Sequence, residues 1–276
     1  MNVLVTGASS GIGRRTAELL AASGHRVFGA ARRTHDLPAG VTPVPLDLTD
    51  DASVDAAVRH VLDEVGTIDV LVNCAGYGEF GSVEETSIDD ARRQLEVNVL
   101  GAARLIQAVL PGMRAAGAGR IVNVSSLAGE FAAPLGGWYH ASKFALEALS
   151  DSLRGEVGQF GVDVAVVQPS YVDTGWHDTA MDRLAEASGT GPYRAMADAM
   201  RRYFASGQVA KQMSTVDQVA AVVACAALEP KPRTRYRVGK GARVAVALAT
   251  FLPDRTFDAL TRAQFGYGRV TRPTAA

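Results

Sequence analysis

Short apolar runs alternate with longer segments of helical periodicity along most of the chain. The runs are rich in Val, Ile and Leu and fall at residues 3–5, 26–31, 41–46, 68–72, 121–124, 162–167 and 236–238. Between them, apolar residues recur every three or four positions, as in Val54, Val58, Val61 and Val65. Strands that alternate with helices in this way form parallel pairs. The pattern predicts an α/β fold, a Rossmann-like doubly wound parallel sheet of about seven strands with helices on both faces.

Length and charge limit what the chain does. Its 276 residues fit one large domain, and a net charge of −1 gives no basic field for nucleic acid or an anionic membrane. No apolar run approaches the roughly 20 residues that span a bilayer, so we expect no integral membrane segment. The first strand begins near the N-terminus, which leaves no room for a signal peptide, and the two cysteines suit neither a disulfide framework nor a metal site. We therefore expect a cytoplasmic protein without a metal.

Two parts of the chain depart from the alternating pattern. Residues 175–213 are polar and contain several Met together with Gly189, Gly191 and Pro192. We interpret them as a small, mobile helical lid over a substrate site. An extension begins at about residue 240 and shows helical periodicity at 243–252 and 255–265. We expect lid and extension to belong to a single domain, 1–276.

A glycine-rich turn follows the first strand directly and precedes a helical segment. It comprises Gly7, Ser9, Ser10, Gly11, Ile12 and Gly13. Strand, glycine turn and helix aim backbone N–H groups and a helix N-terminus at a phosphate, and a Cβ would hold that phosphate away. A glycine trio alone is as typical of a tight turn, but its position after the first strand predicts a dinucleotide pyrophosphate site.

The end of the second strand predicts which dinucleotide binds. Arg32 and Arg33 stand there, and no acid lies between His25 and His35. An acid at this place usually accepts from the ribose 2′-hydroxyl of NAD, whereas arginine suits the 2′-phosphate of NADP. We predict a preference for NADP(H) through Arg32, assisted by Arg33 or Arg14, while NAD(H) stays possible. The alternative is a pair of solvated surface arginines.

Residues after the third and fourth strands complete the predicted cofactor site. Asp47 and Leu48 follow the third strand, where Asp47 is placed either to accept from an adenine amino group or to start the next helix. Asn73, Ala75 and Gly76 follow the fourth strand, and small residues there let a ribose pack against the loop.

Tyr139 and Lys143 stand four residues apart in a segment expected to be helical, so they share one helix face. A neighbouring ammonium lowers the pKa of a phenol, which would let Tyr139 act as a general acid near neutral pH. Ser126, at the exit of the fifth strand, can bring its hydroxyl to the same point. Taken alone, such a pair is more often an ordinary helix surface.

The ordered set of these motifs resembles the short-chain dehydrogenase/reductase family over about residues 2–240. The motifs run Thr6-Gly7-x-x-x-Gly11-x-Gly13, Asp47, Asn73-x-Ala75-Gly76, Asn98, Ser126, Tyr139-x-x-x-Lys143 and Pro169-x-x-Val172-x-Thr174. Each motif is weak alone, and their order makes the resemblance specific. Cys74 and Ser170 depart from it, since the family often has Asn and Gly there.

The resemblance implies a catalytic tetrad of Asn98, Ser126, Tyr139 and Lys143. Tyr139 would donate a proton to a carbonyl oxygen that Ser126 orients, while Lys143 would bind the nicotinamide ribose and lower the pKa of the tyrosine. Asn98, in a kinked helix, would hold a water between Lys143 and solvent. Further along, the resemblance assigns the nicotinamide carboxamide and a phosphate to Pro169, Val172 and Thr174.

The substrate class also follows from the resemblance, which is nearest to hydroxysteroid and retinol dehydrogenases and their bacterial relatives. It implies hydride transfer between NADP(H) and a ketone, aldehyde or alcohol that is steroid-like, retinoid-like or otherwise lipophilic. The expected pocket wall is largely apolar, as such a ligand requires. Besides Ser126 and Tyr139 it comprises Phe131, Pro134, Leu135, Trp138, Tyr171 and Trp176.

Two other functions stay open. A 3-oxoacyl-carrier-protein reductase or polyketide ketoreductase would share the tetrad and need a basic docking face, to which Arg114, Arg120 and Arg154 would contribute. A non-catalytic NADP(H)-sensing regulator would share the fold, but such proteins typically lack the tyrosine or the lysine.

The expected partners are a small-molecule carbonyl or alcohol and further copies of the chain, with no nucleic acid. By family resemblance, the helices around 89–115 and 138–160 would form the contact of a homodimer or homotetramer. Residues 244–252, flanked by Arg243 and Arg255, would cover the pocket, meet a subunit edge or lie on a membrane surface.

Overall fold

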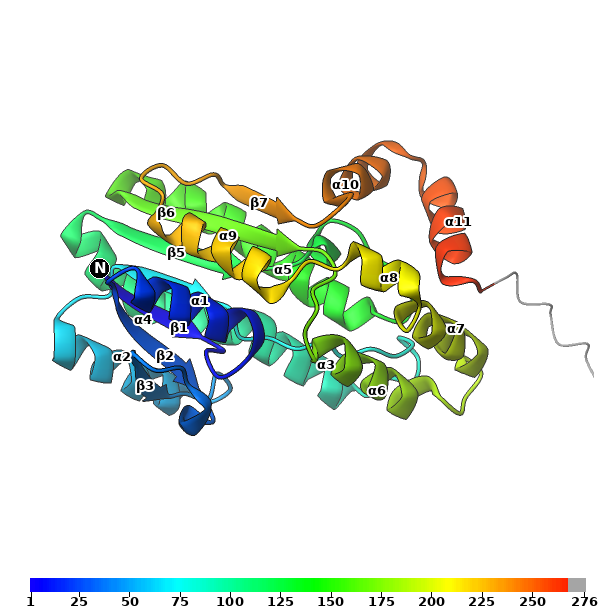
Figure 1. Ribbon diagram of the computed structural model, residues 1–276, viewed down its shortest axis with the longest axis horizontal. Coiled ribbons are helices and arrows are strands. Elements are labelled where there is room, and N and C mark those ends of the chain that lie inside the picture. The colour runs from blue at the N-terminus through cyan, green and yellow to red at the C-terminus, as the bar shows by residue number, and fades with distance from the viewer. Residues whose placement is uncertain (268–276) are drawn as a thin grey trace, which may run out of the picture.

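All seven predicted strands pair in one parallel sheet in the computed structural model, which describes residues 1–267 (Figure 1). The spatial order is β3-β2-β1-β4-β5-β6-β7. The strands are β1 (Asn2–Thr6), β2 (Arg26–Ala31), β3 (Val41–Pro45), β4 (Val70–Asn73), β5 (Gly119–Val124), β6 (Val162–Pro169) and β7 (Arg235–Val238). The predicted doubly wound α/β fold is confirmed. Because the order reverses beside β1, the loops after β1 and β4 diverge there and leave a crevice at the carboxyl edge.

Helices connect the strands and continue beyond the last one. They are α1 (Gly11–Ala22), α2 (Asp51–Val65), α3 (Ile88–Leu95), α4 (Gly101–Ala116), α5 (Gly137–Val157), α6 (Trp176–Ser188), α7 (Arg194–Phe204), α8 (Gly207–Gln212), α9 (Val216–Leu228), α10 (Ala242–Phe251) and α11 (Asp254–Phe265). No helix within residues 1–267 has the length and apolar character that crossing a membrane requires.

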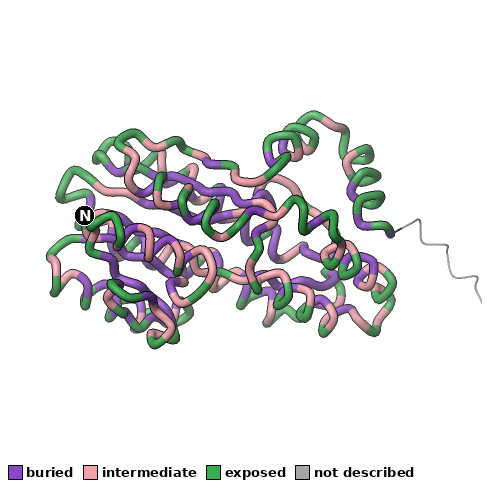
Figure 2. Tube along the Cα trace, in the orientation of Figure 1, coloured by how far each residue is buried: buried purple, intermediate pink, exposed green. Residues whose placement is uncertain are grey.

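The two faces of the sheet are covered by different helices because successive strand residues point to opposite sides. Val3 and Val5 of β1 pack with Leu20 of α1 and Val219 of α9. Leu4, between the two valines, packs on the other face in a cluster formed with α2, α4 and α5. Both faces of the inner strands are buried, so these strands consist of apolar runs, whereas the edge strands β3 and β7 alternate (Figure 2).

Helix α2 shows how local signals set helix ends. The Asp50 side chain accepts from the backbone N–H of Ala52 at 3.0 Å and caps the N-terminus. Gly66 ends the helix in the left-handed region, with φ of 72°.

The long helix expected around Asn98 is interrupted by a π-helical turn, η2 (Glu96–Leu100), between α3 and α4. Such turns add a residue to the helix and shift the backbone carbonyls out of register. The predicted irregularity at Asn98 therefore has a defined form, a widened turn with Asn98 at its buried centre.

The predicted lid and extension are both helical. Residues 175–213 form α6, α7 and α8, and the extension forms α10 and α11, which project from the carboxyl edge of the sheet beyond β7 (Figure 1). Much of α10 and α11 is exposed (Figure 2). Residues 268–276 of the predicted extension lie outside the described residues.

Candidate active site

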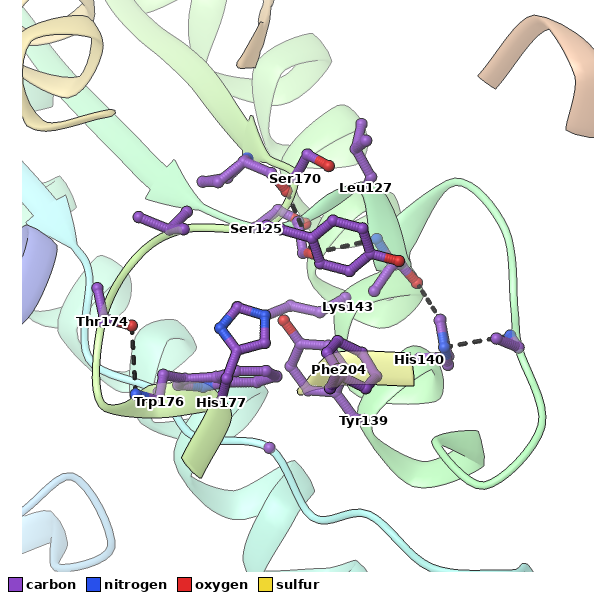
Figure 3. A pocket seen from close by; sticks show the side chains of 18 of the residues that line it. Ser125, Leu127, Tyr139, His140, Lys143, Ser170, Thr174, Trp176, His177 and Phe204 are labelled. Carbon is purple, nitrogen blue, oxygen red and sulfur yellow. Dashed lines mark hydrogen bonds between the residues drawn. The ribbon is translucent and has the colours of Figure 1, made fainter. Parts of the chain in front are cut away.

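A cavity of about 900 Å³ lies at the carboxyl edge of the sheet. Its walls come from the glycine turn after β1, the loop after β4, the ends of β5 and β6, one face of α5, the lid helices and the two C-terminal helices. Figure 3 shows the part around Tyr139, where the ring of Trp176 from α6 packs against the phenol. The cavity is at the place where open α/β sheets bind ligands.

The glycine turn forms one end of this cavity. Gly7, Ser10, Gly11, Ile12 and Gly13 line it, whereas Ser9 does not. Ser10 precedes α1 without a side-chain cap, so the first backbone N–H groups of the helix stay available to a ligand.

The glycines of this turn are required by close backbone approach. Gly7 has φ of +67°, and a Cβ there would lie 3.0 Å from the Cα of Ala75. A Cβ on Gly13 would overlap the backbone of Gly7. The turn therefore keeps bare backbone against the cavity, which is the shape that a pyrophosphate needs.

Arg32 lines the cavity beyond the glycine turn, as predicted, and is exposed. The two arginines expected to assist it lie outside the lining. Arg33 pairs with Asp36 at 3.2 Å, and Arg14 pairs with Glu18 at 3.2 Å. Of the predicted cations for a 2′-phosphate, only Arg32 faces the cavity.

Asp47 and Leu48 also lie outside the cavity lining. The Asp47 carboxylate accepts from the backbone N–H of Thr49 at 2.9 Å and from the Thr49 hydroxyl at 2.7 Å. These bonds hold the pKa of Asp47 below its usual range. Leu48 is buried in the apolar cluster beneath the sheet. The structure thus places Asp47 in the turn before α2, whose N-terminus is capped by Asp50.

The loop after β4 is tied to the end of β1. The Thr6 hydroxyl accepts from the backbone N–H groups of Cys74 and Ala75, each at 3.0 Å. Cys74, Ala75 and Gly76 line the cavity, and because Cys74 uses only its backbone here, its departure from the family pattern leaves the loop intact.

Asn73 lies below the cavity floor and does not line it. Its amide donates to Asn123 Oδ1 at 2.9 Å, and Asn123 donates to the Ser150 hydroxyl at 2.8 Å. This buried chain of polar groups joins β4, β5 and α5. Asn73 therefore supports the site through the sheet, and its predicted role beside the ribose stays a prediction.

Lys143 is buried on the cavity floor, with its ammonium donating to the carbonyl of Val124 at 3.0 Å. Burial lowers the pKa of Lys143 to about 8. Nζ lies 5.9 Å from the centre of the Tyr139 ring. The predicted neighbourhood of the two side chains on α5 is therefore present.

Tyr139 points its hydroxyl into the cavity from α5 (Figure 3). Burial raises the pKa of Tyr139 to about 12, and the nearby Ser126 hydroxyl offsets only part of the shift. The expected lowering of this pKa by Lys143 is wrong for the structure as described, because desolvation of the phenol dominates. At neutral pH Tyr139 is a protonated phenol, the form that donates a proton.

Ser126 stands where β5 leaves the sheet and caps a short 3₁₀ turn, η3 (Leu127–Gly129). Its hydroxyl accepts from the N–H of Ala128 at 3.1 Å and lies 3.4 Å from the carbonyl of Pro169, to which it donates. The bond to Pro169 is long, so the Ser126 proton is available to a ligand oxygen in the cavity.

Asn98 holds the loop after β4 against α5. Its Oδ1 accepts from the N–H of Tyr77 at 3.1 Å, and its Nδ2 donates to the Tyr77 carbonyl at 2.9 Å and to the Ser142 hydroxyl at 3.1 Å. Ser142 in turn donates to the carbonyl of Tyr139 at 2.7 Å. The side chain is thus engaged in positioning, so the expected water site would depend on the backbone of the widened turn.

The loop after β6 closes the cavity opposite the glycine turn. Pro169, Ser170, Tyr171, Val172 and Thr174 line the cavity. A Cβ on Gly11 would lie 3.8 Å from Thr174 Cγ2, so the two loops face each other. The Thr174 hydroxyl accepts from the N–H of Trp176 at 3.2 Å and starts α6, which links this loop to the lid.

Of the residues predicted for the substrate wall, Phe131, Tyr171 and Trp176 line the cavity. Pro134, Leu135 and Trp138 do not. Leu135 packs behind Tyr139 and Phe80. Successive helix residues point about 100° apart. Because Tyr139 points inward from the first turn of α5, Trp138 beside it points elsewhere.

His140, which the sequence did not single out, fixes the wall next to Tyr139. Its Nδ1 bonds to the carbonyl of Ala128 at 3.0 Å, and its Nε2 accepts from the N–H of Ala133 at 3.1 Å. The ring is therefore a neutral imidazole with its proton on Nδ1, and burial lowers its pKa accordingly. Its position directly after Tyr139 was the only signal in the sequence.

The lid and the extension contribute further wall residues that sequence reasoning missed. Their shared property is an apolar or aromatic side chain facing the cavity. They are His177, Met200, Phe204, Val244, Leu248, Phe257, Leu260 and Phe265, with Phe80 from the loop after β4. No local pattern fixes which face of a helix in a lid or extension turns toward a distant pocket.

The charges around the cavity are of one sign. Arg32, Lys143 and Lys240 line it, and no Asp or Glu of residues 1–267 does. This lining favours an anionic ligand at the end formed by the glycine turn and Arg32.

The arginines expected to form a carrier-protein docking face are largely engaged within the chain. Arg120 binds Asp163 at 2.9 Å and the carbonyl of Glu229 at 2.7 Å. Arg154 binds Asp151 at 2.5 Å, and Arg114 lies over the ring of Phe160 at 5.8 Å. They form no joint basic surface beside the cavity.

Comparison with known proteins gives a family match and several relatives. Residues 1–185 match the family model described as short chain dehydrogenase. The 3-ketodihydrosphingosine reductase of Bacteroides thetaiotaomicron is 39% identical over 187 residues, which are 68% of this chain and 69% of that protein. The NADPH-dependent 3-dehydrocapnine reductase of Ornithobacterium rhinotracheale is 32% identical, covering 92% and 94%.

A solved structure agrees over nearly the whole length. The crystal structure of a short-chain dehydrogenase from Streptomyces avermitilis is 34% identical, with a TM-score of 0.75, and the match covers 99% of this chain and 98% of that one. The similarity therefore includes the lid and the C-terminal helices as well as the sheet.

Proposed function

Because the chain belongs to the short-chain dehydrogenase/reductase family, which makes it an NAD(P)-dependent oxidoreductase acting on CH–OH or carbonyl groups, we propose a more specific reaction. We propose that the protein reduces lipophilic ketones with NADPH. One observation carries the proposal. A protonated, buried phenol, that of Tyr139, faces a cavity with a bare glycine turn and Arg32 at one end and apolar rings at the other.

The residues present fit a phosphorylated dinucleotide. The glycine turn offers backbone N–H groups for a pyrophosphate, and the cavity carries cations without carboxylates among the described residues. Arg32 would bind the 2′-phosphate, while Lys143 and the loop Pro169 to Thr174 would hold the nicotinamide half. When bound, the nicotinamide supplies or accepts the hydride.

The chain's own groups then handle the proton. In the reducing direction the Tyr139 hydroxyl gives its proton to the carbonyl oxygen as that oxygen gains charge, and Ser126 donates a hydrogen bond to the same oxygen. Lys143 would hydrogen-bond the nicotinamide ribose and supply the proton that restores the Tyr139 phenol. Asn98 keeps the Tyr77 loop and α5 in register through Ser142.

The apolar end of the cavity supports a lipophilic substrate. Phe131, Trp176, Phe204 and Phe257 contribute rings there. Two relatives are named as reductases, and one of those names states dependence on NADPH, which supports reduction with NADPH as the working direction. We propose a ketone with a bulky apolar part as the substrate class.

We further propose a single domain in a cytoplasmic homodimer or homotetramer. Leu100, directly before α4, and Phe144 on α5 are exposed apolar residues in the segments expected to form the subunit contact. Light scattering of the purified protein measures the assembly directly.

A substrate and cofactor screen tests the proposed reaction. Steroids, retinoids, aliphatic ketones and acyl thioesters are offered with NADPH and with NADH, and kcat/KM is compared. We expect bulky free ketones with NADPH to give the highest values. Preference for acyl thioesters would favour a carrier-protein reductase, and no turnover of any carbonyl would contradict the proposal.

Arg32 provides a sharper test of cofactor choice. Replacing it with Ala removes the one predicted 2′-phosphate ligand that faces the cavity, so kcat/KM for NADPH should fall about 10- to 100-fold, while that for NADH stays nearly constant. Arg33→Ala is the matched control, because Arg33 pairs with Asp36 outside the cavity. Equal losses with both cofactors would show that Arg32 does not read the 2′-phosphate.

A further inference from the structure

Helix α10 is apolar around most of its circumference and yet lies on the surface. Its ten residues, ARVAVALATF, include one charged side chain, that of Arg243, and only Ala242 and Val246 are buried. Helices of this composition are normally covered on all sides. Because α10 is covered on one side only, its outer face is an unpartnered surface (Figure 2).

The exposed apolar side chains gather at the mouth of the cavity. Val244, Leu248 and Phe251 of α10 are 62%, 43% and 84% exposed, and their spacing of four and three residues places them on one helix face. Leu260 of α11 is 48% exposed. We call these four residues the rim patch. Val244, Leu248 and Leu260 also line the cavity, so the patch is continuous with the apolar interior of the site.

The segment that carries the rim patch has an excess of cationic side chains. Between residues 240 and 265 the chain carries four cationic side chains, Lys240, Arg243, Arg255 and Arg262, against two carboxylates, Asp254 and Asp258, although the whole chain has a net charge of −1. An apolar helix face bordered by Lys and Arg has the composition of a helix that lies in the interface of an anionic bilayer.

We propose that the rim patch docks on an anionic lipid surface, with α10 lying in the interface and the cavity mouth opening toward the lipid. No spanning helix is needed for such binding, which rests on buried apolar side chains and on attraction between cations and headgroups. The inference rests on the proposed function in one respect, since a lipophilic ketone would then enter the cavity from the bilayer without crossing water.

The geometry disfavours a second copy of the chain as the occupant. In a two-fold contact centred on the patch, the patch would meet itself, which brings Arg243 and its cationic neighbours of both copies together. A protein surface packed on Val244 and Leu248 would also close the mouth that these residues line. An anionic lipid surface avoids both problems. It offers negative charge to the cations, and because it is fluid it leaves the cavity mouth accessible.

Vesicle sedimentation tests the docking. The full-length protein is mixed with vesicles of phosphatidylcholine alone or of phosphatidylcholine with phosphatidylglycerol, and the bound fraction is measured. We expect stronger binding to the anionic vesicles. The triple variant V244S/L248S/F251S should bind about tenfold more weakly, and Arg243→Glu should reduce the preference for anionic vesicles. Val83→Ser is the matched control, since Val83 is 69% exposed and lies outside the cavity lining.

Each other outcome contradicts the docking. Absence of vesicle binding by the wild type, or equal binding by the triple variant, overturns it. If light scattering instead shows a dimer that the triple variant dissociates, the patch is an interface between copies. Turnover of a water-soluble ketone by the wild type without vesicles is measured in parallel, so that failure of docking and failure of the proposed reaction are distinguished.

Discussion

Tyr139 and Lys143 sit side by side on α5, and burial shifts their pKa values in opposite directions. The pKa of the phenol rises to about 12 and that of the ammonium falls to about 8. Both shifts favour the uncharged form of the group. The pair is therefore a protonated acid next to a lysine that gives up its proton near physiological pH, which is the state needed to deliver a proton and then replace it.

Lys143 makes stability depend on pH with a definite sign. Its pKa is about 8 in the folded chain, against 10.5 for a fully solvated lysine such as that of the unfolded chain. The unfolded chain therefore binds more protons between these values, and stability rises with pH there. Lys143→Met removes the cost of the buried charge, so the variant should be more stable near neutral pH, by about 1–3 kcal/mol.

Urea unfolding of wild type and Lys143→Met, from about pH 7 to about pH 10, measures this effect. The advantage of the variant should shrink as pH rises. The raised pKa values of Cys74 and Tyr139 make the unfolding free energy fall as pH rises into the alkaline range. Both proteins share this fall, so it cancels when their unfolding free energies are subtracted. A gap that stays constant with pH would show that the buried ammonium costs nothing.

Predictions for single residues succeeded where a spacing rule alone determines which side chains meet. They failed where the position or pKa of a side chain depends on its surroundings in the folded chain. Tyr139 and Lys143 meet because four residues make one helical turn. Trp138 was misplaced because the rotation of α5 about its axis depends on packing against η3 and β6. The pKa of Tyr139 moved the other way from expectation, since a sequence does not report the solvent removed from a side chain.

At the scale of elements, His140 joins α5 to the loop that carries Phe131. His140→Ala breaks the bonds to the Ala128 carbonyl and the Ala133 N–H. Phe131 then loses its fixed support, so KM for bulky ketones should rise about tenfold, with a smaller change for a short ketone.

Steady-state kinetics on a bulky and a short ketone check this expectation. His35→Ala is the control, because His35 is exposed at the surface beside Asp36. Equal rises of KM for both ketones would mean that His140 supports the catalytic groups and not the substrate wall.

The inner strands of the sheet were predictable because they are apolar runs buried on both faces. Even the interruption at Asn98 carried a signal, an amide between two valines, although only the structure shows that it is a π turn bonded to Tyr77. For the lid, the sequence predicted the residue range but not the packing of its helices. Helices α6 and α7 are held by aromatic contacts such as that of Trp176 with Tyr139, at 5.0 Å between ring centres, and such pairs join residues far apart in sequence.

For the whole molecule, the sheet supplies the cofactor end of the cavity and the C-terminal helices supply its far wall. Helix α11 docks through Phe265, which packs edge-on against Tyr203 with ring centres 4.9 Å apart and stacks on Tyr267 at 6.0 Å. Two further contacts hold α11, the Phe257 ring beside Phe131 at 5.6 Å between ring centres and the Gln264 amide donating to the Tyr203 hydroxyl at 2.7 Å. Phe265→Ala should therefore release α11 locally while the sheet stays folded.

Limited proteolysis and urea unfolding together test this release. Cleavage near Arg255 and Arg262 should speed up and KM for bulky ketones should rise, while the unfolding free energy falls by less than the roughly 3–5 kcal/mol of a core Phe→Ala change. A full loss of that size without faster cleavage would place Phe265 in the main core instead.

The central claim is that Tyr139 donates the proton in an NADPH-dependent ketone reduction. Tyr139→Phe keeps the ring against Phe80 and Trp176 and removes only the hydroxyl. Measured with a bulky ketone, kcat should fall by about 10²- to 10⁴-fold, while the Kd for NADPH changes little because the glycine turn and Arg32 are untouched. A variant that turns over at nearly the wild-type rate while binding NADPH normally would contradict the account.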